Sequence, residues 1–275
     1  MIRALAIAAL AAGCFSEPRR PTCSAARKLE LVNGAADDLG PWLSEDRREL
    51  IFASKRDGGF DLYRATRGDF DVPFEAPVKF GGDVNTSENE GDPFVMHDGK
   101  TVWFTSTRHG STVGQLYVAT RRNGDLTLDR EATELGEGRH PSLTSDGLTI
   151  YFEAYDGIYT QIFTATRGSE SKPFGPSRVI SEIEVDAVQF TPAISADGNT
   201  LLFATASPTG ASRLMRAHRG SGGVFGTPEA VDEVPAPIAG DDSDPFLMPD
   251  GKTILFASTR DPSGTNDFDI YLACE

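Results

Sequence analysis

The 275-residue sequence is short of positive charge: 26 Lys and Arg stand against 41 Asp and Glu, giving a formal net charge of −15. Nucleic-acid binding depends on clustered Lys and Arg that displace counterions from phosphate, so this balance disfavours a nucleic-acid partner. The same balance disfavours adhesion to an anionic membrane surface through a basic patch. Cationic ligands, metal ions and basic protein surfaces remain open as partners, although the charge also keeps a protein soluble without any binding role.

Long apolar runs are absent after the first fourteen residues, MIRALAIAALAAGC, so no later segment is long enough to span a bilayer. That first segment has one Arg, a run of Ala, Leu and Ile, and small residues before a Cys, which is typical of a secretory signal. Its ending resembles the bacterial lipobox, with Ala11 where Leu is more usual. The resemblance implies a signal peptide over 1–13, lipidation of Cys14 and a short linker over 14–25. An ordinary cleaved signal peptide is the alternative.

Cysteine is also scarce, with three in the chain. When Cys14 is set aside, Cys23 and Cys274 remain, near the two ends of the mature chain. In an exported protein such an even pair predicts a disulfide.

One motif is present in five copies, in which a Pro is followed five residues later by Asp and six residues after that by Phe. The two clearest copies are DPFVMHDGKTVWFTSTR from Asp92 and DPFLMPDGKTILFASTR from Asp244. The prolines stand at positions 41, 93, 141, 192 and 245, so the period is 48 to 53 residues. Self-similarity at this period is typical of solenoids, propellers and repeat arrays.

Each copy has the pattern of four short strands. Asp-Gly between two segments rich in β-formers predicts a hairpin turn, because Gly takes the positive φ that the turn needs; the first copy departs, with Arg47 in place of Gly. A strand such as DLYRATR and a weaker segment such as FEAPVKF follow, and no stretch has convincing helical periodicity. The pattern predicts an all-β fold, a five-bladed β-propeller of four-stranded antiparallel blades over residues 26–275.

The ends of the repeat predict how the ring closes. The fifth copy ends after its third strand, whereas ARKLELVNG (residues 26–34) precedes the first copy like an orphan fourth strand. We expect this N-terminal strand to complete the last blade, which removes the exposed edges of an open array. The same pairing brings Cys23 and Cys274 near each other, so their disulfide would hold the ring closed.

The motif P-x-x-x-x-D-G-K-T-x-x-F-x-S-T-R, followed by D-[IL]-Y-x-A, resembles the WD40-like repeat of the TolB-type propeller family, which is found in many bacterial envelope lipoproteins. The resemblance covers residues 28–275. TolB itself has a further blade and a separate N-terminal domain, so the match is to the repeat. It implies a protein-binding or ligand-binding scaffold in the periplasm or at the outer membrane, although some such repeats belong to peptidases.

Acid and Arg residues occur together in three of the five copies. An acid stands three residues before the Pro and an Arg follows eighteen residues after the acid, in the pairs Asp38 and Arg56, Glu90 and Arg108, and Asp242 and Arg260. The two copies without the acid, which carry Gly138 and Gln189, also lack the Arg. This co-occurrence favours structural ion pairs over free carboxylates.

A ligand site is the competing interpretation for the polar residues near the axis. The residues directly before the Pro should gather round the channel mouth: Gly40, Asp92, His140, Thr191 and Asp244. The copies without an ion pair leave further polar side chains available, so we expect any ligand to bind at Glu137, His140, Asp156, Asp186 and Gln189.

An enzyme is the second hypothesis, because some five-bladed propellers are glycosidases that use two carboxylates. Arg partners would hold the pKa values of the acids low, which is wrong for a general acid. The sequence lacks G-x-S-x-G, and its four His residues lie in four different copies, so neither a hydrolase nucleophile nor a zinc helix is indicated. The repeated aromatic residues, and with them Trp42 and Trp103, are interpreted as core.

Together these observations predict a non-catalytic binding or scaffold protein of the cell envelope, lipid-anchored at Cys14 in the periplasm or at the outer membrane. We expect a monomer that recognises an envelope protein or a peptidoglycan or other glycan ligand at the propeller mouth, with no cofactor and no metal. A glycan-binding protein or a glycoside hydrolase of the five-bladed type is the alternative.

Overall fold

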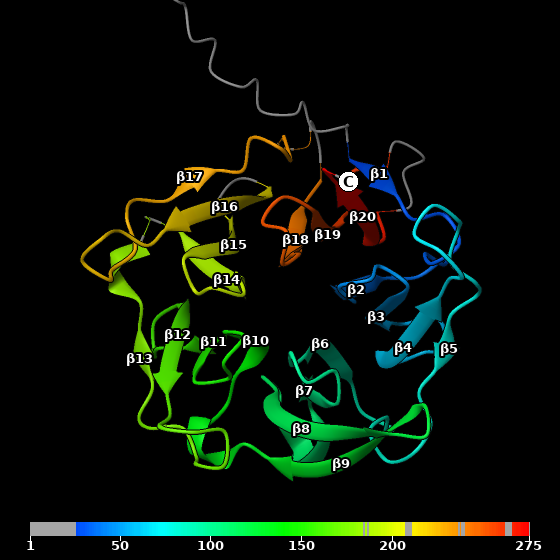
Figure 1. Cartoon of the computed structure of the whole chain (residues 1–275), viewed down its shortest axis with the longest axis horizontal. Coiled ribbons are helices and arrows are strands. Elements are labelled where there is room, and N and C mark those ends of the chain that lie inside the picture. The colour runs from blue at the N-terminus through cyan, green and yellow to red at the C-terminus, as the bar shows by residue number, and fades with distance from the viewer. Residues whose placement is uncertain are drawn as a thin grey trace, which may run out of the picture.

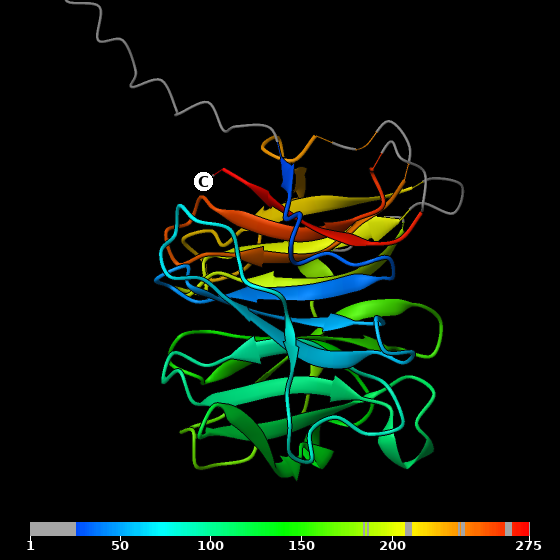
Figure 2. The ribbon, with the colours of Figure 1, turned by 90° about the vertical axis from the view of Figure 1, so that its right-hand side faces the viewer.

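The fold is an all-β propeller of five four-stranded antiparallel blades, as predicted. The computed structural model describes residues 26–183, 185, 187–206, 211–235, 237, 240–261 and 266–274. Figure 1 looks down the axis and shows the strands β2, β6, β10, β14 and β18 innermost; Figure 2 shows the ring edge-on. The predicted signal peptide and linker, residues 1–25, lie outside the described residues.

The strand bounds repeat from blade to blade. Blade 1 contains β2 (Asp38–Leu43), β3 (Glu49–Ser54), β4 (Asp61–Thr66) and β5 (Val78–Lys79). Blade 2 contains β6 (Glu90–Val95), β7 (Thr101–Ser106), β8 (Gln115–Arg122) and β9 (Asp125–Glu131). Blade 3 contains β10 (Arg139–Leu143), β11 (Thr149–Tyr155), β12 (Thr160–Thr166) and β13 (Arg178–Val179). Blade 4 contains β14 (Val188–Ile194), β15 (Thr200–Ala206), β16 (Ser212–His218) and β17 (Glu229–Ala230). Blade 5 contains β18 (Asp242–Leu247), β19 (Ile254–Ser258), β20 (Asp269–Ala273) and β1 (Arg27–Lys28). Three short 3₁₀ helices, Arg108–Gly110, Thr133–Leu135 and Ser181–Ile183, lie in connecting segments.

The repeated Asp shapes the turn between the first two strands of each blade. In blade 2, Asp98 Oδ1 accepts hydrogen bonds from the backbone N–H groups of Lys100 and Thr101, both at 2.8 Å, and Gly99 has a φ of 66°. Arg47 adopts the same left-handed backbone without being Gly, with a φ of 60°. Its side chain donates to Asp250 of blade 5 at 2.9 Å, and this contact offsets part of the backbone cost.

The repeated Phe forms the core between blades. Its ring is completely buried in all five copies: Phe52, Phe104, Phe152, Phe203 and Phe256. In blade 1 it pairs across the strands with Tyr63, and the cluster around them draws Leu255, Ile270 and Leu272 from blade 5. Each blade therefore buries its apolar face against the next one, which is why the repeat needs a closed ring to leave no face exposed.

The N-terminal strand β1 closes the ring, as predicted. It pairs antiparallel with β20, placing Arg27 opposite Leu272 and Lys28 opposite Tyr271. Lys28 also forms 2.7 Å ion pairs with Asp261 and Asp269. Blade 1 repeats this contact in its own outer strand, where Lys79 Nζ lies 2.6 Å from Asp61.

The predicted disulfide involves one residue that the structure describes. Cys274 follows β20 directly and is buried, with 6% exposed. Cys23 lies outside the described residues, so the disulfide stays a prediction.

Candidate functional site

Five residues, one from each blade, surround the axis near the start of the inner strands. They are the residues directly before the repeated Pro, which we call the axial ring: Gly40, Asp92, His140, Thr191 and Asp244. All five have a positive φ, between 48° and 57°. The pairing of the two inner strands shifts register at this point in every blade. Left-handed backbone is costly for residues other than Gly, so the surrounding structure, not local preference, holds four of these side chains at the axis.

In the described part of the chain, cavities lie at both ends of the inner strands. A small one of about 40 Å³ lies at the axial ring, where Phe94 and Phe246 also line it. A larger one of about 810 Å³ opens at the opposite end of the inner strands, where the Asp turns lie; we call it the funnel. Ligand-binding cavities typically have volumes of about 300–1,000 Å³, so the funnel is large enough for a ligand or for part of a partner.

The lining of the funnel is mostly apolar and differs between its two sides. The residue after the repeated Pro is aromatic in blades 5, 1 and 2 (Phe246, Trp42 and Phe94) but small in blades 3 and 4 (Ser142 and Ala193). The three aromatic side chains, which are half-buried, form the floor of the funnel. Residues of the turns form its rim, including Glu45, His97, Ser145, Ala196 and Pro249. The funnel is thus aromatic on the side of blades 5, 1 and 2, and Leu143 and Ile194 line it on the side of blades 3 and 4.

His140 joins three carboxylates at the axis. Its Nε2 lies 3.0 Å from Asp92 Oδ1 and 2.9 Å from Asp244 Oδ1, and its Nδ1 lies 3.0 Å from Glu153 Oε2. Arg139, the neighbour of His140, places a guanidinium nitrogen 2.5 Å from Glu153 Oε1. All three carboxylate side chains are at least 86% buried, since the most exposed, that of Asp92, is 14% exposed.

These contacts hold the cluster ionised. Burial by itself lowers the pKa of His140, but the charges of Asp92 and Glu153 outweigh it and raise that pKa well above 6.5. Burial by itself raises the pKa of Asp92, but the His140 charge and hydrogen bond outweigh it and bring the pKa to about 2. The pKa of Glu153 is lowered against its burial by His140 and Arg139. The five charged groups therefore carry a net charge of about −1 at neutral pH.

The same spacing bears on metal binding. One ligand atom each from Asp92, His140 and Asp244 lies within 4.8 Å of the others, which is close enough to hold an ion. A histidine binds metal only as the neutral imidazole, whereas the carboxylates here favour its protonated form. The residues fit an imidazolium held between two carboxylates better than a metal centre, so the expectation of no metal stays a prediction.

The structure brings together the members of each predicted acid–Arg pair. Arg56 Nη2 lies 2.9 Å from Asp38 Oδ1, Arg260 Nη2 lies 2.7 Å from Asp242 Oδ2, and Arg108 Nη2 lies 3.6 Å from Glu90 Oε1. All three acids are fully buried. In every pair the Arg Nε also donates to a Ser at the end of the second strand, namely Ser54, Ser106 and Ser258.

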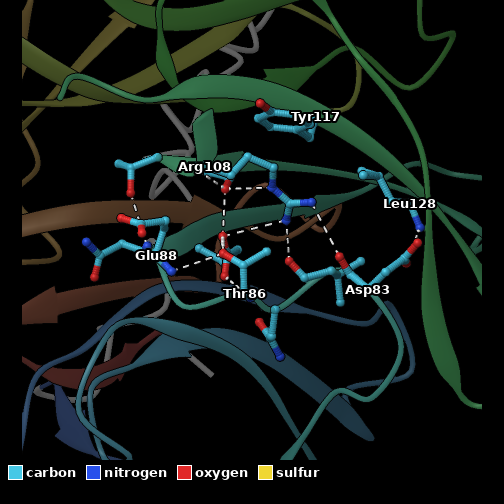
Figure 3. Close-up of polar contacts among 12 residues, drawn as sticks. Asp83, Thr86, Glu88, Arg108, Tyr117 and Leu128 are labelled. Carbon is cyan, nitrogen blue, oxygen red and sulfur yellow. Dashed lines mark hydrogen bonds and ion pairs between the residues drawn. The ribbon is translucent and has the colours of Figure 1, made fainter. Parts of the chain in front are cut away.

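Each pair also fixes the loop that enters its blade. Figure 3 shows blade 2, where the guanidinium of Arg108 lies near Tyr117 and donates to the carbonyls of Asp83, at 3.3 Å, and Val84. Glu90 in turn accepts from the backbone N–H of Thr86 at 2.6 Å. Arg56 and Arg260 repeat the contact with the carbonyls of Val32, at 2.8 Å, and Pro235, at 3.4 Å. These ion pairs therefore organise the blades, and the carboxylates of Asp38, Glu90 and Asp242 are used within them.

Blade 3 excludes such a pair for a steric reason. A Cβ atom on Gly138 would lie 2.7 Å from the Phe152 ring and 3.0 Å from the Glu153 carbonyl. We expect that the double change Gly138→Asp and Asp156→Arg, which restores the motif, lowers the free energy of unfolding by about 1–3 kcal/mol through overpacking. Chemical denaturation measures this, with Gly68→Ala as control, since no atom lies within 4 Å of the added methyl group. A more stable double variant would contradict the steric explanation.

The residues predicted to bind a ligand do not form one site in the described part of the chain. His140 lies in the axial ring, but Gln189 is buried and donates to the Ile183 carbonyl at 3.0 Å. Asp156 is exposed and accepts two backbone N–H groups of its own turn, and Glu137 is exposed 3.2 Å from Ser111 Oγ. Asp186 lies outside the described residues. The funnel instead opens at the end of the inner strands away from Gly138 and Gln189.

Two features of the site were missed from sequence. Glu153 occupies a position that is Ala53, Thr105, Ala204 or Ala257 in the other copies, so a lone acid among small residues was the available signal. Trp103 is buried, with 1% exposed, as expected of a core residue; Trp42 is half-buried against a core cluster and also lines the funnel. The spacing of the repeated residues does not show at which end of the inner strands the larger cavity opens.

Known structures share this architecture. The fold is similar to that of a protein of Agrobacterium tumefaciens assigned as TolB, with a TM-score of 0.55, 18% identity and coverage of 85% of this chain and 76% of that one. TolB from Acinetobacter baumannii gives a TM-score of 0.52 at 17% identity, over 89% of this chain and 56% of that one. An α-L-arabinofuranosidase of Podospora anserina gives 0.58 at 12% identity, over 88% and 93%.

These likenesses agree with the β-propeller class of fold, whose structural neighbours include both TolB and glycoside hydrolases, while the five blades follow from the strand order. No protein-family model matches the sequence, and no curated protein matches it. Within the described residues, no helix is long and apolar enough to cross a membrane.

Proposed function

We propose that the chain is a non-catalytic binding protein of the cell envelope that receives a segment of a protein partner in the funnel. The observation that carries the proposal is the funnel itself, a cavity of about 810 Å³ with an aromatic floor at the axis. Half-buried aromatic side chains in a cavity are typical anchors for a partner, because they bury a large area at low entropic cost.

The electrostatics of the axis support binding over catalysis. A glycosidase needs one carboxylic acid with a raised pKa that can protonate the leaving group. In the axial cluster the pKa of Asp92 and that of Glu153 are both lowered, and protonated His140 lies between the carboxylates. The pKa of Asp242 is raised, but this side chain is fully buried and paired with Arg260. A glycan ligand remains the second candidate, favoured by the aromatic floor and by glycoside hydrolases among the similar folds.

The cellular setting is part of the proposal. The signal peptide over 1–13, the lipid at Cys14 and the disulfide between Cys23 and Cys274 would place a monomeric propeller in the periplasm or at the outer membrane. Fatty-acid labelling of the full chain and of its Cys14→Ala variant tests the anchor, and labelling that is unchanged in the variant would overturn it.

Site-specific photo-crosslinking in envelopes of the producing cells tests the binding role. A photoreactive amino acid replaces Ser145 on the funnel rim or, as matched control, Glu229 on the exposed outer strand β17. We expect an adduct of discrete mass from position 145 that disappears in the Trp42→Ala background, and none from 229. Equal labelling from both positions would overturn the proposal. Retention on peptidoglycan or polysaccharide, lost with Trp42→Ala and without a protein adduct, would favour the glycan alternative.

A further inference from the structure

We propose that the floor of the funnel binds an alkylammonium cation, with the aromatic side chains of Trp42, Phe94 and Phe246 against the cation and the axial carboxylates behind it. This rests on the proposed function, because it names the chemical group that the funnel would accept at its deepest point. The group is either a free quaternary ammonium compound or the side chain of a Lys on the partner.

The arrangement of the aromatic residues is the first reason. They come from three consecutive blades, and the rings of Trp42 and Phe246 lie 6.2 Å apart at an angle of 57°. Ser142 and Ala193 occupy the same position in the other two blades, where the aliphatic side chains of Leu143 and Ile194 line the funnel instead. Aromatic rings that line a small space can bind alkylated ammonium groups through the negative faces of the rings.

The position of the carboxylates is the second reason. Asp-Pro-Phe occurs twice, at residues 92–94 and 244–246, so each acid stands two residues from a floor aromatic on one strand. Phe94 and Phe246 line both the funnel and the small axial cavity that the two Asp residues also line. The carboxylates of Asp92 and Asp244 in the axial ring thus lie directly beyond the aromatic floor of the funnel.

The balance of charge in the axial ring favours a cation. Asp92, Asp244 and Glu153 all contact the imidazolium of His140, and Arg139 adds a second cation beside Glu153. Asp244 Oδ1 is buried and accepts no hydrogen bond within the described residues, although it lies 2.9 Å from His140 Nε2. The net charge of the chain, −15, acts in the same direction by attracting cations and repelling anions.

Intrinsic fluorescence of the mature exported chain measures binding at this floor. The chain has two Trp residues, of which Trp103 is buried and Trp42 lines the funnel, so a Trp103→Phe variant reports on Trp42 alone. The probes are choline, Nα-acetyl-lysine amide and the neutral isostere of choline, 3,3-dimethylbutan-1-ol. We expect saturable binding of at least one cation and about tenfold weaker binding of the neutral isostere.

Matched variants separate the aromatic contribution from general apolarity. Phe94→Leu with Phe246→Leu keeps an apolar floor but removes two aromatic faces, and it should weaken cation binding about tenfold. Phe70→Leu, at an exposed position outside the funnel lining, should leave binding unchanged. Nile red, a neutral apolar dye, should bind the native chain and the double Leu variant alike.

The outcomes distinguish the two proposals. The cation site would be overturned if choline and its isostere bound equally, or if the double Leu variant bound the cations as tightly as the native chain. In either case, Nile red binding would still support the funnel as a binding cavity. If the folded native chain bound neither Nile red nor either cation, both the cation site and the proposed binding role of the funnel would be overturned. Tighter binding of choline would assign the site to a free quaternary ammonium compound, and tighter binding of the Lys derivative would assign it to a partner side chain.

Discussion

Replacing His140 with alanine is expected to lower the free energy of unfolding by about 3–5 kcal/mol, because it leaves buried carboxylates without their shared counter-charge. Asp92 and Asp244 would lose their cation at 3.0 and 2.9 Å, and only Arg139 would remain, beside Glu153. Urea denaturation of the purified domain measures the change. His109→Ala is the matched control, since its side chain is 73% exposed and its removal should cost under about 0.5 kcal/mol.

The pH dependence of the difference in unfolding free energy between the native chain and His140→Ala shows whether that difference is electrostatic. Because the pKa of His140 is raised in the folded state, its contribution is complete below about pH 6.5 and is lost as the pH rises through the raised value. The pKa values of Asp92 and Glu153 are lowered, so their contribution is present above about pH 4.5 and is lost as the pH falls toward about 2. The difference between native and His140→Ala should therefore be largest between about pH 4.5 and 6.5. A difference that does not vary with pH would contradict the electrostatic explanation.

Arg260→Ala is expected to destabilise the chain by a similar amount, about 3–5 kcal/mol, because Asp242 stays fully buried without its partner. The pKa of Asp242 is raised, since its burial outweighs the hydrogen bonds from Arg260 and Ser258. Burial of the Asp242 carboxylate therefore costs more than its contacts return, which corrects the expectation that an Arg partner holds this pKa low.

Charge reversal tests the pairing itself. Asp242→Arg and Arg260→Asp should each destabilise strongly, and the double variant should recover about 0.5–3 kcal/mol of the summed loss. Recovery would be incomplete, because the reversed pair loses the Arg260 contacts with Ser258 at 3.0 Å and with the Pro235 carbonyl. Additive losses in the double variant would show that Asp242 and Arg260 do not act as a pair.

The fold was predictable because each blade repeats the same physical requirements. The Pro, the Asp of the turn and the buried Phe recur in strict register, and the missing fourth strand of blade 5 indicated that residues 26–34 close the ring. Because the acid and the Arg occur together in three copies and are both absent from the other two, the sequence predicts the three ion pairs. Such features follow from periodicity, which a single sequence displays fully.

The site was less predictable because it depends on departures from the repeat. The sequence placed His140 near the axis, yet it did not show that Glu153, on the second strand of blade 3, would meet it at 3.0 Å. The register shift between Arg139 and Ser142 recurs in every blade, but the acid that meets the axial residue is found in blade 3 alone. Likewise, the funnel is lined by the aromatic residues of three blades and by Leu143 and Ile194 of the other two. Their side chains pack in three dimensions, so the funnel and the role of Trp42 emerge only from the assembled ring.

The most direct test of the account is an NMR titration of His140 and of the carboxyl groups of Asp92, Glu153 and Asp244 in the folded chain. If the axis is built for binding, the His140 ring titrates well above pH 6.5, and Asp92 and Glu153 titrate below their ordinary range. A His140 that loses its proton near pH 6.5, together with an axial carboxyl group titrating at about pH 6–7, would contradict the account and identify the general acid of a glycoside hydrolase.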